Sequence, residues 1–245
     1  MSEPADRVSR KTYVLVHGAF HGGWCWRDVA QDLRARGHDV YCPTLTGLGE
    51  RSHLLAAKPT LETFIEDVAQ VIKYEGLSHV ILVGHSFAGS VVSGLADRIP
   101  DKLRHLVYMD AQVLQSGESP AGGAPREHIE RYEQRAIQTS NGRLLPPGEP
   151  SSFDVTDAKM ADWVKARLTP HPFETYFNPL VLKHPIGNGI AATYVACMKP
   201  PRPVLAKTQE FARRQKGWTY VELPTGHNAM MTMPSELSDL LANVV

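Results

Sequence analysis

Short apolar runs alternate with amphipathic stretches through the first 110 residues. Four runs have the composition of strands: Tyr13–Val16, Asp39–Cys42, Val80–Val83 and Leu103–Met109. Three stretches between them repeat apolar residues at helical spacing: Trp26 to about Arg36, Leu61–Tyr74 and Gly89–Arg98. Gly37 is expected to end the first helix, Thr60 to cap the second and Pro100 to stop the third. Strands alternating with helices predict an α/β fold, with a mostly parallel, doubly wound sheet covered by helices on both faces.

The alternation stops after Asp110 and resumes near Ile190. Residues 113–188 are rich in proline and glycine, with helical patches at Arg126–Gln138, Ala158–Leu168 and Phe173–Leu180. Four aromatic residues in this segment favour a folded, helical cap over a flexible linker: Trp163, Phe173, Tyr176 and Phe177. We therefore expect a core of residues 1–112 and 189–245 with a cap (lid) insertion at 113–188. The core resumes with a strand (Ile190–Cys197), a helix (Val204–Lys216), a strand (Trp218–Leu223) and a final helix from Pro234.

Composition narrows the class of partner. The chain has 245 residues, is 42% apolar and 21% charged, and has a formal net charge of zero, which argues against nucleic acid or an acidic membrane as partner. The polar start lacks the apolar core of a signal peptide and no run is long enough to span a membrane, so we expect a cytoplasmic protein. Its expected partner is a small-molecule ester, and a homodimer is compatible with the sequence. Buried thiols are expected at Cys25, Cys42 and Cys197.

The stretch from His79 to Val92, HVILVGHSFAGSVV, carries the candidate nucleophile. A buried strand runs into Gly84, Ser86, Ala88 and Gly89, and a helix follows. Small neighbours allow a sharp strand-to-helix turn that exposes a serine hydroxyl. The alternative is a tight turn with a purely structural role.

Two further residues reach the same edge of the predicted sheet. Asp110 follows the fourth strand and His227 the sixth, and loops at the carboxyl ends of parallel strands meet. A serine needs a base to take its proton, and that imidazole needs a partner to hold its tautomer. Ser86, His227 and Asp110 can fill these roles. The alternative for Asp110 is a cap on the turn that leaves its strand.

The loop after the first strand, HGAFHGGW, can supply an oxyanion hole. Its strand is expected beside the serine strand, so the amides of Ala19 and Phe87 can point to one place. The alternative is a flexible glycine loop.

The segments VLVHGAFHGGWCW and VILVGHSFAG resemble the α/β-hydrolase fold family, in particular its plant methyl esterase and hydroxynitrile lyase group. TLTGLGER and TGHNAM resemble bacterial esterases of the pyrethroid-hydrolase type even more. The resemblance covers nearly the whole chain, and is weakest in the cap. It implies Ser86 as nucleophile, His227 as base, and Ala19 and Phe87 as oxyanion donors.

The position of the candidate acid in the sequence departs from the family pattern. Most members place it in the loop that here spans Ala196–Pro203, which contains no carboxylate. Asp110 occupies an alternative position that resembles some lipases and lactonases of the fold. Glu210 and Glu222 are weaker candidates, because one falls in a predicted helix and the other in a predicted strand.

We expect a serine hydrolase that cleaves carboxylic esters of small apolar or aromatic molecules without metal or cofactor. We expect His17 to position a loop or to bind substrate. An apolar wall of the pocket is expected from Phe20, Trp163 and Met230. The related lyases carry a lysine after the histidine and a threonine at the position of Gly18, whereas this chain has Asn228 and glycine. A cofactor-free lyase, dioxygenase or cyclase using the His–Asp pair, and a non-catalytic ligand receptor, are the alternatives.

Overall fold

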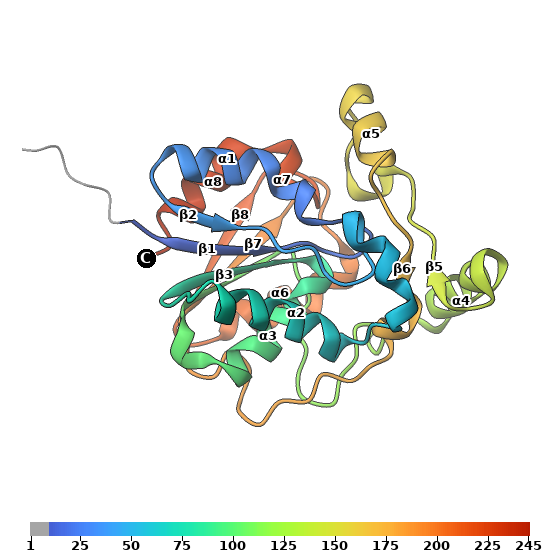
Figure 1. The fold of residues 1–245 in the computed structure, drawn as a ribbon, viewed down its shortest axis with the longest axis horizontal. Helices are drawn as coiled ribbons and strands as arrows, with labels where there is room; N and C mark the ends of the chain where they lie inside the picture. The colour runs from blue at the N-terminus through green and yellow to red at the C-terminus, as the bar shows by residue number, and fades with distance from the viewer. Residues whose placement is uncertain (1–9) are drawn as a thin grey trace, which may run out of the picture.

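The computed structural model describes residues 10–245 (Figure 1). Most of the polar start that argues against a signal peptide, residues 1–9, lies outside the described residues. Within the described chain, no helix has both the length and the apolar character needed to cross a bilayer.

Six parallel strands form the central sheet in the order β2-β1-β3-β4-β7-β8. Their bounds are β1 Thr12–Val16, β2 Asp39–Tyr41, β3 Val80–His85, β4 Leu103–Met109, β7 Ala192–Cys197 and β8 Trp218–Leu223. The predicted α/β fold and each of the six predicted strands are therefore confirmed, within two residues at the ends. Because β1 and β4 flank β3, the loops that leave all three strands meet at one edge.

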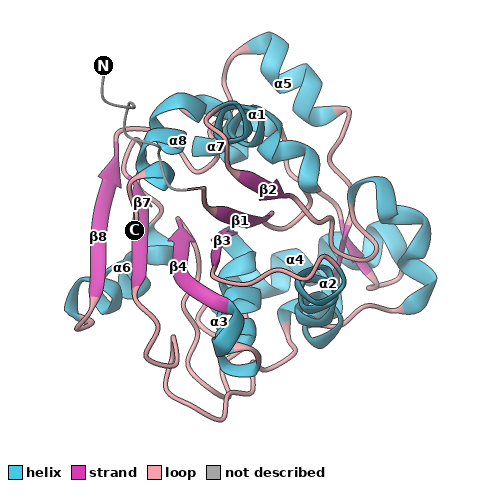
Figure 2. Ribbon diagram, turned by 60° about the vertical axis from the view of Figure 1, so that its left-hand side comes forward, coloured by secondary structure: helices cyan, strands magenta, loops and turns pink. Residues whose placement is uncertain are grey.

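Helices cover both faces of this sheet (Figures 1 and 2). They are α1 Arg27–Ala35, α2 Leu61–Tyr74, α3 Gly89–Arg98, α6 Ala206–Arg214, the short α7 Ala229–Thr232 and α8 Pro234–Ala242. Alternate strand residues enter two separate cores. Val80 and Leu82 belong to the first core and face α2 and α3, whereas Ile81 and Val83 belong to the second core and face α1 and α8. Burial on both faces explains why β1, β3 and β7 are nearly continuous apolar runs.

Local signals at the helix ends have the predicted effect. Thr60 caps α2, since its Oγ1 accepts from the Thr63 amide at 3.2 Å and its own amide donates to Thr63 Oγ1 at 3.1 Å. Gly37 follows α1 with φ of 89°, and its amide donates to the Arg34 carbonyl.

Residues 113–188, called the insertion below, leave the core after β4. They contain α4 Arg126–Ser140, α5 Ala158–Lys165 and a two-stranded ladder of β5 Leu144–Leu145 and β6 His171–Pro172. Both long helices project to one side of the sheet (Figure 1). Phe173 and Leu180 bury their side chains in the first core, and Val155 and Val164 in the second.

Two predicted segments differ. Phe173–Tyr176 is a short 3-10 turn and not the helix expected to Leu180, because Asn178 turns its side chain to accept from the Leu61 amide and Pro179 follows. The expected loop from Pro43 to His53 runs into a 3-10 helix at Gly49–Ala57. Its residues are exposed or half-buried, so no apolar period marks it in the sequence.

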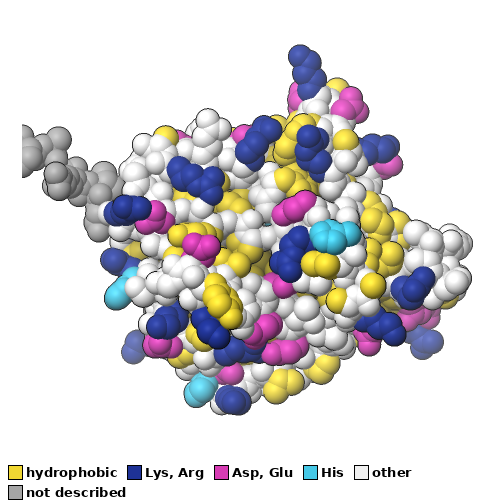
Figure 3. Space-filling view, viewed as in Figure 1, with side chains coloured by type: hydrophobic (Ala, Val, Ile, Leu, Met, Phe, Trp, Pro, Cys, Tyr) yellow, Lys and Arg dark blue, Asp and Glu magenta, His cyan; other side chains and the backbone are white. Residues whose placement is uncertain are grey.

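Charges of both signs are interspersed on the face seen in Figure 3. This face carries no extended basic field of the kind that binds a polyanion.

Candidate active site

Ser86 lies on the turn between β3 and α3. Its φ is 55°, in the left-handed region, and a short 3-10 turn, Ser86–Ala88, leads into the helix. Glycine is required at position 84, because a Cβ there would lie 2.5 Å from Val92 Cγ2 and 2.8 Å from the Ala88 carbonyl oxygen. The local sequence therefore forces the sharp bend that holds Ser86 above the sheet edge.

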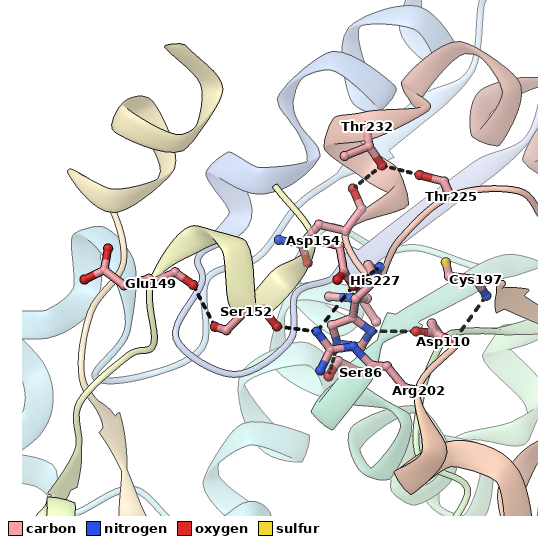
Figure 4. A network of polar contacts seen from close by, with 12 residues as sticks. Ser86, Asp110, Glu149, Ser152, Asp154, Cys197, Arg202, Thr225, His227 and Thr232 are labelled. Carbon is pink, nitrogen blue, oxygen red and sulfur yellow. Dashed lines mark hydrogen bonds and ion pairs between the residues drawn. The ribbon is translucent and has the colours of Figure 1, made fainter. Parts of the chain in front are cut away.

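Three side chains form a continuous line at this edge (Figure 4). His227 Nε2 lies 2.8 Å from Ser86 Oγ, and His227 Nδ1 lies 2.6 Å from Asp110 Oδ2. The other oxygen of Asp110 accepts from the Cys197 amide at 3.2 Å. With Nδ1–H donating to the carboxylate, Nε2 is free to accept the serine proton.

Burial sets the protonation states of Asp110 and His227. Asp110 is fully buried, and desolvation raises its pKa to about 6, against the opposing effects of the Cys197 amide and Arg202. Burial also lowers the pKa of His227 well below its ordinary value, and the positive charge of Arg202 adds to this effect. At neutral pH the histidine is therefore neutral and able to act as a base, beside an ionised carboxylate.

The main chain of His227 is fixed on both sides. Its amide donates to Asp154 Oδ2 at 3.0 Å, and its carbonyl accepts from His85 Nε2 at 3.0 Å. The next residue, Asn228, is buried and donates through Nδ2 to His21 Nε2 at 3.2 Å. The imidazole thus sits on a loop held from three directions.

The two predicted oxyanion donors come from two segments that meet at Ser86. Phe87 follows it directly, and Ala19 comes from the loop after β1. A Cβ on Gly18 would lie 2.9 Å from Ser86 Cβ, so this loop passes against the serine. The Ala19 carbonyl accepts from His21 Nδ1 at 2.7 Å, which holds the peptide that follows it.

The four residues expected in a substrate pocket have different surroundings. Phe20 follows Ala19 and packs on Phe153 and His171. His17 is buried and bridges two loops, with Nε2 accepting from the Leu45 amide. Met230 is fully buried in the second core, and Trp163 packs on Trp24 at the rim of a hollow of about 320 Å³. Among these four, only Phe20 shares an aromatic neighbour, His171, with Phe87.

Aromatic rings of the insertion surround Phe87 and Phe20. His171 is fully buried and lies 4.9 Å from Phe87, Tyr176 lies 5.4 Å from Phe87, and Phe153 lies 6.0 Å from Phe20, between ring centroids. Sequence reasoning missed His171, Tyr176 and Phe153 as neighbours of the site. Their only signal was the aromatic content of the insertion.

The alternative acids point elsewhere. Glu222 pairs with Arg213 at 2.5 Å and Glu210 pairs with Arg214, both on the exposed side of β8 and α6. The loop that follows β7 contributes Arg202 instead, which lies 3.6 Å from Asp154. Neither Asp154 nor Arg202 was identified from the sequence.

Residues 10–245 contain no group of three or more histidine, cysteine or acidic side chains placed to hold a metal ion. Cys25 and Cys197 are buried and Cys42 is half-buried, and all three are free thiols.

Comparisons with known proteins identify the family of this chain. A model of the alpha/beta hydrolase family matches residues 13–240. A carbendazim-hydrolysing esterase of Nocardioides sp. is 41% identical over 94% of this chain and 98% of its own length. The pyrethroid hydrolase of Sphingobium wenxiniae is 38% identical over 44% of this chain and 38% of its own length, and methylesterase 7 of Arabidopsis thaliana is 34% identical over 47% and 45%.

One solved structure matches almost end to end. It is described as an extracellular alpha/beta-hydrolase from a Paenibacillus species with homology to tobacco salicylic acid binding protein 2. It superposes with a TM-score of 0.83 at 26% identity, over 94% of this chain and 97% of that one. The chain therefore belongs to the alpha/beta hydrolase family, and its esterase relatives place it among the carboxylic ester hydrolases.

Proposed function

We propose that this enzyme hydrolyses carboxylic esters of small apolar or aromatic molecules through an acyl-enzyme formed on Ser86. The observation that carries the proposal is the line of contacts from Ser86 Oγ through His227 to Asp110, at 2.8 and 2.6 Å. A neutral imidazole within hydrogen-bond distance of a serine hydroxyl is the arrangement that turns a weak nucleophile into a reactive one.

The reaction proceeds in two halves. Ser86 Oγ attacks the ester carbonyl while His227 Nε2 takes its proton, and the histidine then gives that proton to the leaving alcohol. Water activated by the same nitrogen attacks the acyl-enzyme and releases the acid and the free serine. Asp110 holds the tautomer and stabilises the imidazolium, and the amides of Ala19 and Phe87 donate to the oxyanion.

The substrate class follows from the aromatic rings around Phe87 and Phe20. Such a wall favours a flat apolar group on the acyl or alcohol side of the ester. The relatives named methylesterase, pyrethroid hydrolase and carbendazim-hydrolysing esterase guide the choice of test compounds. The screen compares aryl acetates, aromatic methyl esters, lactones, a pyrethroid and carbendazim.

The test of the mechanism is covalent labelling. A fluorophosphonate should label wild type on the peptide that contains Ser86, and Ser86→Ala should lose both labelling and turnover of 4-nitrophenyl acetate by at least about 10³-fold. Labelling elsewhere, or full activity in Ser86→Ala, would refute the proposal. If the enzyme turns over no ester, oxygen uptake would select the dioxygenase alternative. Cleavage of a substrate without consumption of water would then select the lyase.

A further inference from the structure

Arg202 connects the loop after β7 to the insertion (Figure 4). Its Nη2 donates to the Ser152 carbonyl at 2.5 Å and lies 3.6 Å from Asp154 Oδ2. The side chains of Arg202 and Asp154 are 27% and 20% exposed, so this pair is less screened by solvent than most ion pairs of the chain.

Asp154 in turn holds the peptide of the candidate base. Its Oδ2 accepts from the His227 amide at 3.0 Å. The preceding residue, Gly226, lets the two segments touch, because a Cβ there would lie 2.2 Å from Asp154 Cβ. Asp154 has a φ of 63° and ends the 3-10 turn Pro150–Phe153, a left-handed position that aspartate adopts more readily than most residues.

We infer that Asp154 and Arg202 are positioning residues that hold the His227 loop in its working geometry and thereby couple the insertion to catalysis. This inference rests on the proposed function, since it assigns both residues to the loop of the proposed base. Neither side chain is assigned to the reacting atoms, and each acts through His227.

Both a short distance and a charge fix the position of the His227 ring. The Ser86–His227 contact of 2.8 Å needs the imidazole to be placed within a few tenths of an ångström, and the bond from Asp154 fixes the main chain from which the ring projects. A hydrogen bond to an ionised carboxylate is stronger than a neutral one. Arg202 keeps that carboxylate oriented.

Asp154 belongs to the insertion, whereas His227 belongs to the core. Any displacement of residues 152–154 away from the core breaks the hydrogen bond to the His227 amide and the contact to Arg202 together. The base is thus fully supported only while this part of the insertion is seated.

The experiment uses three variants and one matched control in the full-length enzyme, with 4-nitrophenyl acetate as substrate. Asp154→Ala removes the acceptor, Asp154→Asn keeps an oxygen that can accept from the His227 amide, and Arg202→Gln removes the charge. Glu149→Gln is the control, because it breaks an exposed ion pair to Lys165 in the same segment without touching the His227 loop. Fluorophosphonate titration counts working sites, so kcat is expressed per active site.

We expect Asp154→Ala to lower kcat per site about 10-fold, with KM changed less than about twofold. Asp154→Asn should keep most of the wild-type kcat per site. Arg202→Gln should move the acidic limb of kcat/KM upward by about half a pH unit, since its charge lowers the pKa of both Asp110 and His227. Glu149→Gln should match wild type. The charged and titratable groups facing His227 are Asp110, His85, His21, Arg202 and Asp154.

Unchanged kcat per site in Asp154→Ala overturns the inference and leaves the proposed function standing, provided Ser86→Ala is inactive. Equal losses in Asp154→Asn and Asp154→Ala, with no pH shift in Arg202→Gln, also overturn it. Full activity in Ser86→Ala refutes the proposed function itself. Should Asp154→Ala fail to fold, the Asn and Gln variants decide the question.

Discussion

At the scale of single residues, the site depends on the protonation states of Asp110 and His227. Asp110 has to be ionised and His227 neutral before Ser86 can lose its proton. Burial acts on the two groups in opposite directions, raising the pKa of Asp110 to about 6 and lowering that of His227. As pH falls, a proton taken up by the Asp110–His227 pair removes the neutral base that stands beside an ionised carboxylate.

The raised pKa of Asp110 predicts the acidic limb of the pH profile. The kcat/KM of wild type should fall as pH drops through about 6, because a proton bound by the Asp110–His227 pair leaves no neutral base beside an ionised carboxylate. Asp110→Asn should lower kcat by about 10³- to 10⁴-fold and abolish this inflection, as measured by pH–rate profiles from pH 4 to 9. Glu222→Gln, which changes an exposed carboxylate paired with Arg213, should keep both rate and profile. An Asp110→Asn enzyme with near wild-type kcat would move the acid elsewhere.

Single residues also differ in how far the sequence reveals them. The sequence alone allowed Ser86, Asp110 and His227 to be placed together, because each lies in a segment that leaves the carboxyl end of a strand in one parallel sheet. Asp154 and Arg202 could not be placed in this way, since their partners are decided by how the insertion folds back on the core. No local pattern states which surface aspartate will meet a main-chain amide 73 residues away.

At the scale of elements, the junction of β3, α3 and the end of β4 places Ser86 beside Asp110. Gly89, the first residue of α3, lies against the segment that follows β4, where a Cβ would come within 1.9 Å of the Gln112 carbonyl oxygen. The Gln112 amide donates to the Ser86 carbonyl at 3.1 Å. The two turns are thus packed as one unit.

Gly89→Ala should therefore cost about 3 kcal/mol in the free energy of unfolding, because the backbone of α3 or of residues 110–112 has to shift. Urea titration followed by circular dichroism measures this value. Gly123→Ala is the control: a Cβ at that position meets nothing within 4 Å, so its stability should stay within about 0.5 kcal/mol of wild type. Equal stability of the two variants would contradict the packing described for this junction.

The central strands were predictable because burial on both faces leaves a continuous apolar run, and the core helices because burial on one face leaves a helical period. β5, β6 and the 3-10 turns were not, since two- to four-residue elements are too short to show a period. Their conformations depend on neighbours such as Asn178 and Leu61, which are far apart in the chain.

At the scale of the whole molecule, one six-stranded sheet with a core on each face carries Ser86, Asp110 and His227, and the insertion contacts the His227 loop through Asp154. The fold and the position of the candidate site follow from the core alone. The neighbours of Phe20 and Phe87 do not, because the rings of Phe153, His171 and Tyr176 reach them only through the path of the insertion. Whether residues 113–188 move as a lid stays a prediction.

The backbone at Ser86, with its φ of 55°, has a consequence for the stability of the entire fold. Holding a non-glycine residue in the left-handed region costs about 1 kcal/mol or more, so the folded enzyme gives up stability to keep its nucleophile exposed. Ser86→Gly and Ser86→Ala lose the same hydroxyl, yet the glycine variant should be the more stable of the two by about 1 kcal/mol in thermal unfolding. An alanine variant as stable as the glycine variant would show that the turn carries no such strain. Selection for reactivity and selection for stability therefore act against each other at this one position.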